Sequence, residues 1–288
     1  MKCIHCNQES ENNVCNHCLI QYYSYCDHCG KLTYFKKMNF NGYNLYCIPC
    51  YNKITFHGNI KEGSYKPNYT FYDVDNTNRK NCCYIGVEIE INNLHGSYKE
   101  RNQFLESIQS FPLYFKKDLS IMDYGVEIVS MPMTYQYMKS TKIWETVFES
   151  MIKYFMTNTE NCGLHFHIDK TYLNNINVHN IDYIVNTFAP YFEKIGGRQF
   201  NHYCKRKKKF IYGTSEDRYE AVNLINSNTV ELRFCKSTYK YKEFMQRLNM
   251  VFNLVEFVKD KAIYDIYNVT ENEIISFFKI NEFDSICT

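Results

Sequence analysis

Four short segments of the chain alternate between apolar and polar residues, a pattern typical of strands with one apolar and one polar face. The alternation spans residues 83–91, 125–131, 163–169 and 229–235. In the first segment it places Glu88 and Glu90 on the same face. In the last it places Glu231 and Arg233 on one face, on either side of Leu232, which we expect to be buried.

Longer segments between these strands carry apolar residues at intervals of three and four positions, the period of a helix with one buried face. This pattern predicts helices over residues 98–109, 137–156, 178–195 and 241–258. Thr270 and Glu273 form a capping-box pattern, which predicts the start of a last short helix. No phosphate-binding glycine loop follows the first strand, and the order of elements therefore predicts an α+β domain with an antiparallel sheet.

Composition divides the 288 residues into three regions, enough for one medium-sized domain and a small appendage. Residues 1–53 contain all the paired cysteines and are expected to form a zinc-binding module. Residues 54–80 are polar and rich in Tyr and Asn, without a clear period, which predicts a linker. Residues 81–288 hold the alternating strands and helices, and we expect the catalytic domain there.

Eight of the 14 cysteines form four Cys-x-x-Cys pairs within the first fifty residues. In a reducing compartment such pairs indicate metal ligation rather than disulfides, and two pairs supply the four thiolates of one structural zinc site. The pairs therefore predict two structural Zn²⁺ ions, with the ligands Cys3, Cys6, Cys15, Cys18, Cys26, Cys29, Cys47 and Cys50. Either consecutive pairs share an ion, or the first and third pairs share one in a cross-braced arrangement.

The zinc ions would also supply the folding energy of this module, because segments this short cannot bury a core. His5, His17 and His28 lie inside Cys-x-x-Cys turns, but eight cysteines already satisfy two ions, and we expect these histidines on the surface. Because the module has few basic residues, a docking or substrate-presenting role is favoured over DNA binding.

The charge balance is close to neutral, with 33 basic and 31 acidic residues, and gives no global indication of a nucleic-acid or membrane partner. No apolar run approaches the length of a membrane span, and the first residues lack the apolar core of a signal peptide. We therefore expect a cytoplasmic protein, located in the host cytoplasm if a phage encodes it.

The strand that carries Glu88 and Glu90 sets two carboxylates about 6–7 Å apart on one face. Hard oxygen ligands in this arrangement suit Mg²⁺ or Mn²⁺. A solvent-exposed strand also shows alternating charge, so this pair alone leaves both interpretations open. Further candidate polar residues follow at Asp118, Ser120 and Glu127, the last of them on a short apolar strand.

Two histidines, His165 and His167, follow a glycine turn and share one face of their strand. Such a pair by itself fits a metal site, a phosphate site or a hydrogen-bonded core. Farther along the chain, Asn223 precedes the strand that carries Glu231 and Arg233. We expect these segments to combine into one site.

The order of these motifs is Glu-x-Glu, a carboxylate strand, Gly-x-His-x-His and then Glu-x-Arg. In this combination the sequence from about Tyr84 to Thr238 resembles the amidoligase family, the carboxylate–amine ligases related to glutamine synthetase. Arg198 and Arg218, each within a short family-like motif, add to the resemblance. It implies a glutamine-synthetase-like catalytic domain with an antiparallel sheet, which uses ATP and Mg²⁺ or Mn²⁺.

The resemblance also implies roles for individual residues. The ligands of the divalent ions would be four carboxylates and one histidine, namely Glu88, Glu90, Glu127, Glu231 and His165. Candidates for binding the nucleotide or the carboxylate substrate are Arg198, Arg218 and Asn223. His167 would contact phosphate or substrate, and Arg233 would face the γ-phosphoryl group. Asp118 is a candidate for the base that deprotonates the incoming amine.

Such a ligase needs ATP because a carboxylate does not react with an amine at neutral pH. Transfer of the γ-phosphoryl group makes an acyl phosphate, and the amine then displaces phosphate to form the amide. Two divalent ions and an arginine would neutralise the charge on the transferring phosphoryl oxygens. Arginine suits this contact better than lysine because its planar guanidinium meets two oxygens at once.

The chain is much smaller than glutamine synthetase and shows no separate half-domain that would complete a neighbour's active site, so a monomer or small oligomer is expected. The basic run Lys205–Lys209 is expected to be a solvated loop. The sequence does not identify the carboxylate substrate, and the amine substrate could be a small molecule, a peptide or a protein side chain.

Two alternative functions also stay open: a metal-dependent hydrolase, and a zinc-finger interaction protein with an inactive ligase-like domain.

Overall fold

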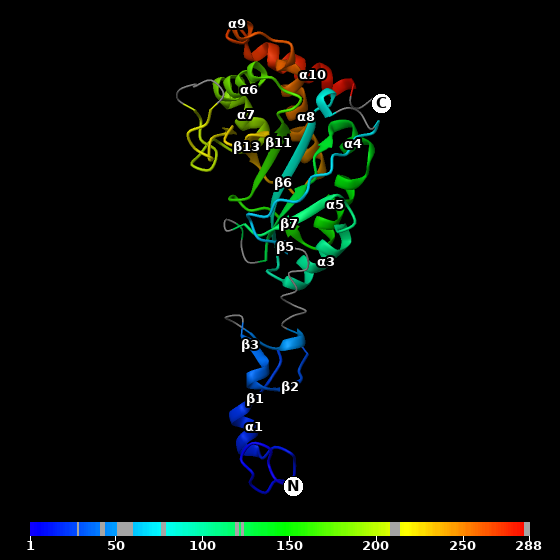
Figure 1. Ribbon diagram of the computed structural model, residues 1–288, viewed down its shortest axis with the longest axis vertical. Helices are drawn as coiled ribbons and strands as arrows, with labels where there is room; N and C mark the ends of the chain where they lie inside the picture. The colour runs from blue at the N-terminus through cyan, green and yellow to red at the C-terminus, as the bar shows by residue number, and fades with distance from the viewer. Residues whose placement is uncertain are drawn as a thin grey trace. The chain divides into compact units, whose positions relative to one another are not determined.

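The structure is a computed structural model that describes residues 1–27, 29–40, 44–50, 60–75, 79–118, 121, 124–207 and 214–284. The chain divides into two compact units, Met1–Gly58 and Asn59–Thr288, and each is described by itself (Figure 1).

The first unit is small, and its described residues include two short hairpins and a helix. Its elements are α1 (Asn16–Tyr22), β1 (Tyr23–Tyr25), β2 (Leu32–Tyr34), η1 (Phe35–Lys37), β3 (Met38–Phe40) and β4 (Leu45–Cys47). Strand β1 pairs with β2 and β3 with β4, both antiparallel. Its one described hydrophobic cluster is built on Cys26, Tyr46 and Cys47, so cysteines take the place of a conventional core.

The second unit is built on a nine-stranded sheet with the order β12-β13-β11-β6-β8-β7-β5, in which β9 and β10 also pair with β6. The strands are β5 (Ile60–Lys61), β6 (Tyr84–Asn93), β7 (Leu113–Lys116), β8 (Val126–Ser130), β9 (Met133–Thr134), β10 (Met156–Thr157), β11 (Gly163–Asp169), β12 (Val222–Asn223) and β13 (Thr229–Lys236). All pairs are antiparallel except β5 with β7. The predicted α+β class with an antiparallel sheet is therefore confirmed, with one parallel pair at the edge.

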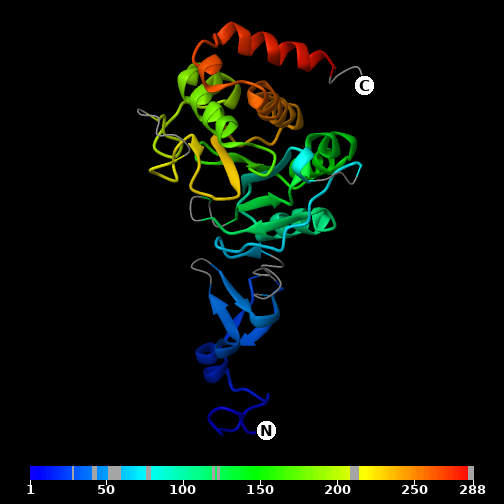
Figure 2. The same cartoon turned by 45° about the horizontal axis from the view of Figure 1, so that its top comes forward.

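Most of the helices of this unit follow the apolar periodicity of the sequence. They are α3 (Tyr98–Ile108), α4 (Tyr135–Ser140), α5 (Ile143–Lys153), α6 (Asn175–Thr187), α7 (Ala189–Gly196), α8 (Tyr241–Lys259), α9 (Ile263–Ile266) and α10 (Glu271–Asp284), with a 3₁₀ turn η2 (Arg79–Asn81). Both α6 and α10 pack on α8, and Figure 2 shows α10 in red beside α8. No helix in the described part of the chain is long and apolar enough to cross a membrane.

Two predicted helices are each divided in the structure. The stretch expected over 137–156 is split between α4 and α5, and the stretch over 178–195 between α6 and α7. Pro190 lies in the first turn of α7, where its missing N–H costs no helical hydrogen bond, although it could not continue α6. The capping box of Thr270 and Glu273 forms as predicted, but the helix that follows is longer than expected.

The central strands of the sheet have one apolar and one polar face. On β6 the side chains of Ile85, Val87, Ile89 and Ile91 are fully buried in the core. The helices pack on this apolar side: the ring of Phe166 on β11 stacks on Phe244 of α8, with centroids 6.5 Å apart. Figure 1 shows β6 and β11 side by side. The opposite face is left for the polar side chains.

The region predicted as a linker contributes to the second unit over its described part. Ile60 and Lys61 form β5, which pairs with Phe115 and Lys116 of β7. Farther on, Tyr72 forms a bridge with Met133, so residues 60–75 run along the sheet. Residues 54–59 and 76–78 lie outside the described part. The polar composition of this stretch did not reveal that it is packed on the sheet.

The basic run Lys205–Lys209 is not wholly solvated, contrary to expectation. The side chain of Lys207 is only 5% exposed, and its ammonium contacts Asp182 at 2.7 Å and Glu220 at 3.2 Å. Lys205, in contrast, forms an exposed pair with Asp217. The sequence does not distinguish a lysine on a solvated loop from a lysine that forms ion pairs inside the fold, whereas the structure does. Lys208 and Lys209 lie outside the described residues.

Candidate metal centre and adjoining cavity

Strand pairing brings the candidate residues of the second unit onto the polar face of the sheet. Glu88 of β6 lies opposite His165 of β11 on one side and Val129 of β8 on the other. His167 lies opposite Glu231 of β13. Directly opposed residues point to the same face, so residues that are far apart in sequence become neighbours.

The first group of candidate metal ligands consists of Glu88, His167 and Glu231. One ligand atom from each residue lies within 4.8 Å of the other two. His167 Nε2 is 3.4 Å from Glu88 Oε2 and, among the described residues, has no hydrogen-bond partner although it is buried. A buried nitrogen without a partner, aimed at two carboxylates, is the arrangement expected of a metal ligand.

The resemblance gave the metal ligand as His165, whereas the structure groups His167 with the two carboxylates. His165 is nevertheless close, because its Nδ1 lies 3.7 Å from Glu88 and 3.8 Å from Glu231. Its other ring nitrogen faces the backbone of Gly163, where a Cβ would lie only 2.5 Å from Nε2. The glycine of the Gly-x-His-x-His motif therefore makes room for the first histidine.

The second group consists of Glu90, Asp118 and Glu127, whose ligand atoms also lie within 4.8 Å of one another. Glu90 and Glu127 are directly opposed on β6 and β8, and Glu90 accepts a hydrogen bond from the backbone N–H of Gly163 at 2.6 Å. Asp118, expected as the base for the amine, lies with these carboxylates as a third candidate ligand. Its role as a base remains a prediction. Ser120 lies outside the described residues.

Lys116, at the end of β7, connects the two groups and was not singled out from the sequence. Its ammonium lies 3.0 Å from Glu127 of the second group and 3.4 Å from Glu88 of the first. The register places it directly opposite Glu127. The only feature of the sequence that could have indicated Lys116 is its position two residues before Asp118. The four-residue strand β7 is too short for its alternation to show which face the lysine side chain takes.

Arg233 contacts the first group through Glu231, to which its Nη1 donates a short hydrogen bond. Asn223 donates to the other oxygen of Glu231 at 2.7 Å and so fixes that carboxylate, and its role in binding nucleotide or substrate stays a prediction. The register between β11 and β13 shifts after Leu232, so that two residues of β13 oppose one of β11. Alternation after the buried Leu232 puts Arg233 on the polar side, and the bulge lets Phe234 and Cys235 both be fully buried.

The two other arginines that were predicted to bind nucleotide or substrate, Arg198 and Arg218, lie outside both acidic groups. Arg198 donates from Nη2 to the backbone carbonyl of Arg233, which supports the strand rather than a ligand. Arg218 is exposed and lies over the ring of Tyr219, 5.1 Å from its centroid. Arg233 lies 5.8 Å from the same ring, so Tyr219 is shared by two guanidinium groups. The roles predicted for Arg198 and Arg218 in binding nucleotide or substrate stay predictions.

The carboxyl groups of the site differ in how readily they ionise. Burial alone would raise the pKa of Glu88, but the charges of His167 and Lys116 outweigh it and hold that pKa well below its usual range. Burial, reinforced by the negative charge of Glu88, raises the pKa of Glu127 to about 9. Burial likewise raises the pKa of Glu90. The two carboxyl groups that Lys116 contacts therefore differ: Glu88 loses its proton more readily than an ordinary glutamate, and Glu127 less readily.

A cavity of about 590 Å³ adjoins the first group, and its wall includes Glu88, Lys116 and His167. Aromatic side chains line much of the remainder, namely Tyr65, Tyr69, Phe71, Tyr84 and Tyr114. Three of these five belong to the stretch expected as a linker. Glu90, Glu127, Glu231 and Arg233 do not line the described cavity, so the acidic face extends beyond it.

One ion pair attaches this aromatic wall to the sheet. Arg79 donates two hydrogen bonds to Asp169 of β11, at 2.6 and 3.0 Å. Its guanidinium also stacks on Phe71, 3.8 Å from the ring centroid. A bidentate arginine pair combined with cation–π stacking fixes the segment that closes one side of the cavity.

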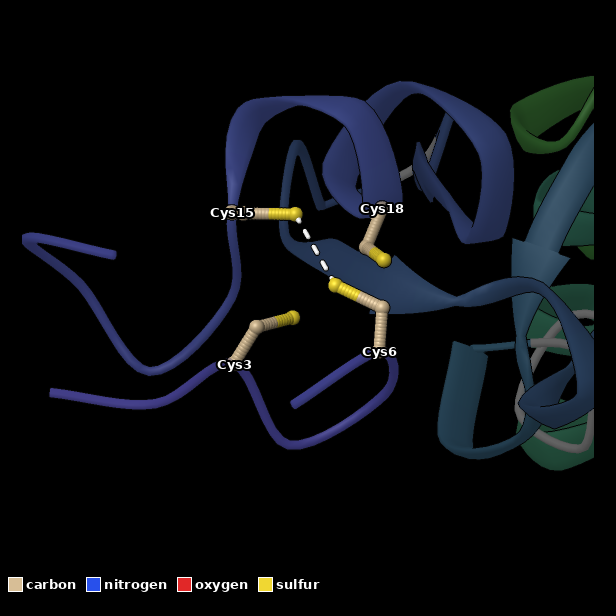
Figure 3. A group of neighbouring side chains, drawn as sticks. All are labelled: Cys3, Cys6, Cys15 and Cys18. Carbon is tan, nitrogen blue, oxygen red and sulfur yellow. Dashed lines mark hydrogen bonds between the residues drawn. The ribbon is translucent and has the colours of Figure 1, made fainter. Parts of the chain in front are cut away.

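The eight cysteines of the first unit form two groups of four, Cys3/Cys6/Cys15/Cys18 and Cys26/Cys29/Cys47/Cys50. Figure 3 shows the four sulfurs of the first group converging, with Cys6 and Cys15 3.6 Å apart. The second group includes a 3.9 Å contact between Cys29 and Cys47. Thiolates bound at about 2.3 Å to a tetrahedral zinc ion are about 3.8 Å apart, so both groups fit zinc. The grouping is consecutive rather than cross-braced.

The histidines of this unit lie as expected where they are described. His5 is exposed, stacks on Tyr34 at 5.1 Å between ring centroids and forms a hydrogen bond with the hydroxyl of Tyr23. His17 is also exposed. His28 lies outside the described residues. Neither described histidine belongs to a cysteine group, and each group offers four thiolates that could hold a metal ion.

Comparisons of the sequence with known protein families and with curated proteins give no match. The resemblance to the amidoligases therefore rests on the sequence motifs alone.

Proposed function

We propose that the second unit is an ATP-dependent carboxylate–amine ligase that forms an amide through an acyl phosphate. The observation that carries the proposal is the pair of three-residue acidic groups on one sheet face, with an arginine against one of them. Two neighbouring divalent ions and a guanidinium are what phosphoryl transfer from ATP requires. The amidoligase resemblance selects the same four glutamates and the same arginine, although it gave His165 in place of His167 as a ligand and Asp118 as a base.

The residues of both groups fit Mg²⁺ or Mn²⁺. Each group offers at least two carboxylate oxygens, and the unpartnered Nε2 of His167 adds a nitrogen to the first. Bound ions would neutralise negative charge on the phosphoryl oxygens. Asn223 and Arg233 each hold one oxygen of Glu231, which fixes the orientation of this ligand.

Arg233 is the residue proposed to face the transferring phosphoryl group. In the structure it pairs with Glu231, and Tyr219 and the carbonyl of Tyr203 also lie beside it. A guanidinium that is held by a metal ligand can stabilise negative charge beside that metal without a large rearrangement. Its backbone is held in turn by Arg198.

The cavity is proposed to hold the nucleotide. Its volume of about 590 Å³ falls in the range of small-molecule sites. The aromatic wall offers faces for a planar base, and the end with Glu88 and His167 would lie nearest the phosphates. The carboxylate and amine substrates would then approach the acidic face from outside the cavity, where a small molecule, a peptide or a protein side chain has access.

A stepwise experiment tests this function. The thermal unfolding midpoint of the full chain is measured with Mg²⁺, with ATP and with both, because a ligand that binds only the folded state raises it. We expect a rise with Mg²⁺ and ATP together that exceeds the sum of the separate rises. Mass spectrometry of host lysate incubated with the protein should then show products that form only with ATP and carry a new amide bond.

The same experiment separates the alternatives. A metal-dependent hydrolase would use the two acidic groups without ATP, and its products would gain water instead of an amide. An interaction protein with an inactive ligase-like domain would show no ATP-dependent product. The intact pairing of Glu231 with Arg233 favours the ligase, because hydrolysis by two metals has no requirement for this pair.

The first unit is proposed to dock a protein or present a substrate. Its described surface exposes several large apolar side chains, among them Ile20, Tyr25 and Phe40. Zinc would stabilise the fold of this unit, since few apolar residues are buried in it.

A further inference from the structure

Lys116 is the only described lysine whose ammonium contacts a member of each acidic group. It lies 3.0 Å from Glu127 Oε2 and 3.4 Å from Glu88 Oε1. Its side chain is 12% exposed, which is little for a lysine. A lysine this enclosed is held by its partners, and here both partners are candidate metal ligands.

A divalent ion in either group would compete with this ammonium. The ion would bind a carboxylate that the ammonium already contacts, and two cations a few ångströms apart in an enclosed site repel each other strongly. Two kinds of cation can therefore contact these carboxyl groups, the ammonium of Lys116 and a bound divalent ion. They cannot occupy the same space.

We propose that Lys116 is the resident counter-ion of the metal centre. Its ammonium contacts Glu88 and Glu127 in the metal-free protein, balances the charge of Glu88, and moves toward the cavity when divalent ions bind. The inference rests on the divalent-ion part of the proposed function and assigns a role to a residue outside the motifs.

The cavity provides the space for this movement. Lys116 lines the cavity together with Glu88 and Tyr114, so its side chain can leave the carboxylates without crossing the sheet. A displaced ammonium in the cavity would attract a polyanion such as a nucleoside triphosphate. Ion binding would then both fill the acidic groups and supply a positive charge to the cavity.

The adjacent lysine provides a matched control. Lys117 pairs with Glu62 at 2.9 Å, and both side chains are largely exposed. It has the same charge and chain length as Lys116 and belongs to neither acidic group. A change seen with Lys116 and not with Lys117 therefore reports the metal centre and not the general charge of this edge of the sheet.

In the first test, the full chain is titrated with Mn²⁺ in the absence of nucleotide. Electron paramagnetic resonance measures the free Mn²⁺ at each step and so gives the dissociation constant. Lys116→Met should bind Mn²⁺ at least about tenfold more tightly than the unaltered chain, because a competing charge has been removed. Lys117→Met should bind as the unaltered chain does. Equal or weaker binding by Lys116→Met would overturn the counter-ion role, whereas absence of Mn²⁺ binding in every variant would overturn the metal centre itself.

The second test needs no substitution and so does not depend on a variant that folds. The unaltered chain is acetylated with a lysine-specific reagent with and without Mn²⁺, and the modified sites are measured by mass spectrometry. Lys116 should become several-fold more reactive when Mn²⁺ is present, while the reactivity of Lys117 stays constant. Unchanged or reduced reactivity of Lys116 at saturating Mn²⁺ would show that its ammonium stays in place.

Discussion

Glu88 and Glu90 lie two positions apart on β6, point to the same face and belong to different acidic groups. Glu88 groups with His167 of the neighbouring strand β11 and with Glu231 of β13. Glu90 groups with Glu127 of β8, the neighbouring strand on the other edge of β6. A single strand therefore supplies one carboxylate to each candidate metal position. The spacing of about 6–7 Å along a strand keeps two such positions apart while one substrate could contact both.

This division predicts that each glutamate controls one ion. The unaltered chain should bind two Mn²⁺ ions, and Glu88→Gln and Glu90→Gln should each retain one. Glu231→Gln should resemble Glu88→Gln and weaken metal and nucleotide binding together, since it acts through the same ion. Calorimetric titration measures the number of sites. Two ions bound by Glu88→Gln with unaltered affinity would contradict the grouping.

Arg233 should affect the reaction more than nucleotide binding. Arg233→Ala should lower the rate of amide formation by at least about a hundredfold, a loss typical of removing a group that stabilises developing charge. ATP affinity should change much less. Arg233→Lys should restore little activity, because an ammonium cannot meet two oxygens at once.

Arg218 serves as the control for that experiment, because it lies on the same tyrosine ring but is exposed and outside both acidic groups. Because Arg218 is a predicted contact of nucleotide or substrate, Arg218→Ala should raise KM more than it lowers the maximal rate, the opposite of the effect expected for Arg233→Ala. If Arg233→Ala forms product at a near-normal rate, Arg233 is only a structural partner of Glu231.

Metal affinity should rise with pH. The pKa of Glu127 in the metal-free protein is raised to about 9 by burial and by the charge of Glu88. An ion must displace this proton, so affinity should increase by up to tenfold per pH unit between pH 6 and 9 and then level off. The measurement is Mn²⁺ titration at several pH values, with proton release followed in a dilute indicator buffer. Glu127→Gln should bind less tightly and lose most of this dependence.

The zinc groups should be independent of the second unit. Metal analysis should return about two zinc ions per chain, and Cys6→Ser should lower that number to about one. A chelator should remove hydrogen-exchange protection from the first unit while the strands β6 and β11 remain protected. Cys82→Ser is the matched control, since Cys82 lies in neither group. Two zinc ions retained by Cys6→Ser would show that Cys6 is not a required ligand of a four-thiolate site.

Lys207 should be important for stability, unlike its neighbour in the basic run. Lys207→Met leaves Asp182 and Glu220 without their shared cation, and we expect a loss of roughly 3–5 kcal/mol in the free energy of unfolding. Lys205→Met removes only an exposed pair with Asp217 and should cost at most about 1 kcal/mol. Urea unfolding followed by circular dichroism compares the two. Similar losses in both variants would show that the pair of Lys207 contributes no more than a surface contact.

The sequence by itself determined the local features of this protein. Alternation predicted which residues of β6, β11 and β13 point away from the core, because successive side chains of a strand point to opposite faces. The spacing of the cysteines likewise predicted ligand pairs, since a Cys-x-x-Cys turn places two thiolates on one edge of a tetrahedron. These predictions needed no knowledge of which segments meet.

Only the tertiary structure decided which of these faces come together. The register placed Glu90 opposite Glu127 and His167 opposite Glu231, and pairing of β7 with β8 placed Lys116 between the groups. Pairing of β5 with β7 placed residues 60 and 61 at the edge of the sheet, and ion pairs with Asp182 and Glu220 placed Lys207 inside the fold. Strand register and burial depend on contacts between distant segments, whose free energy is set by the whole core and is not encoded in any local pattern.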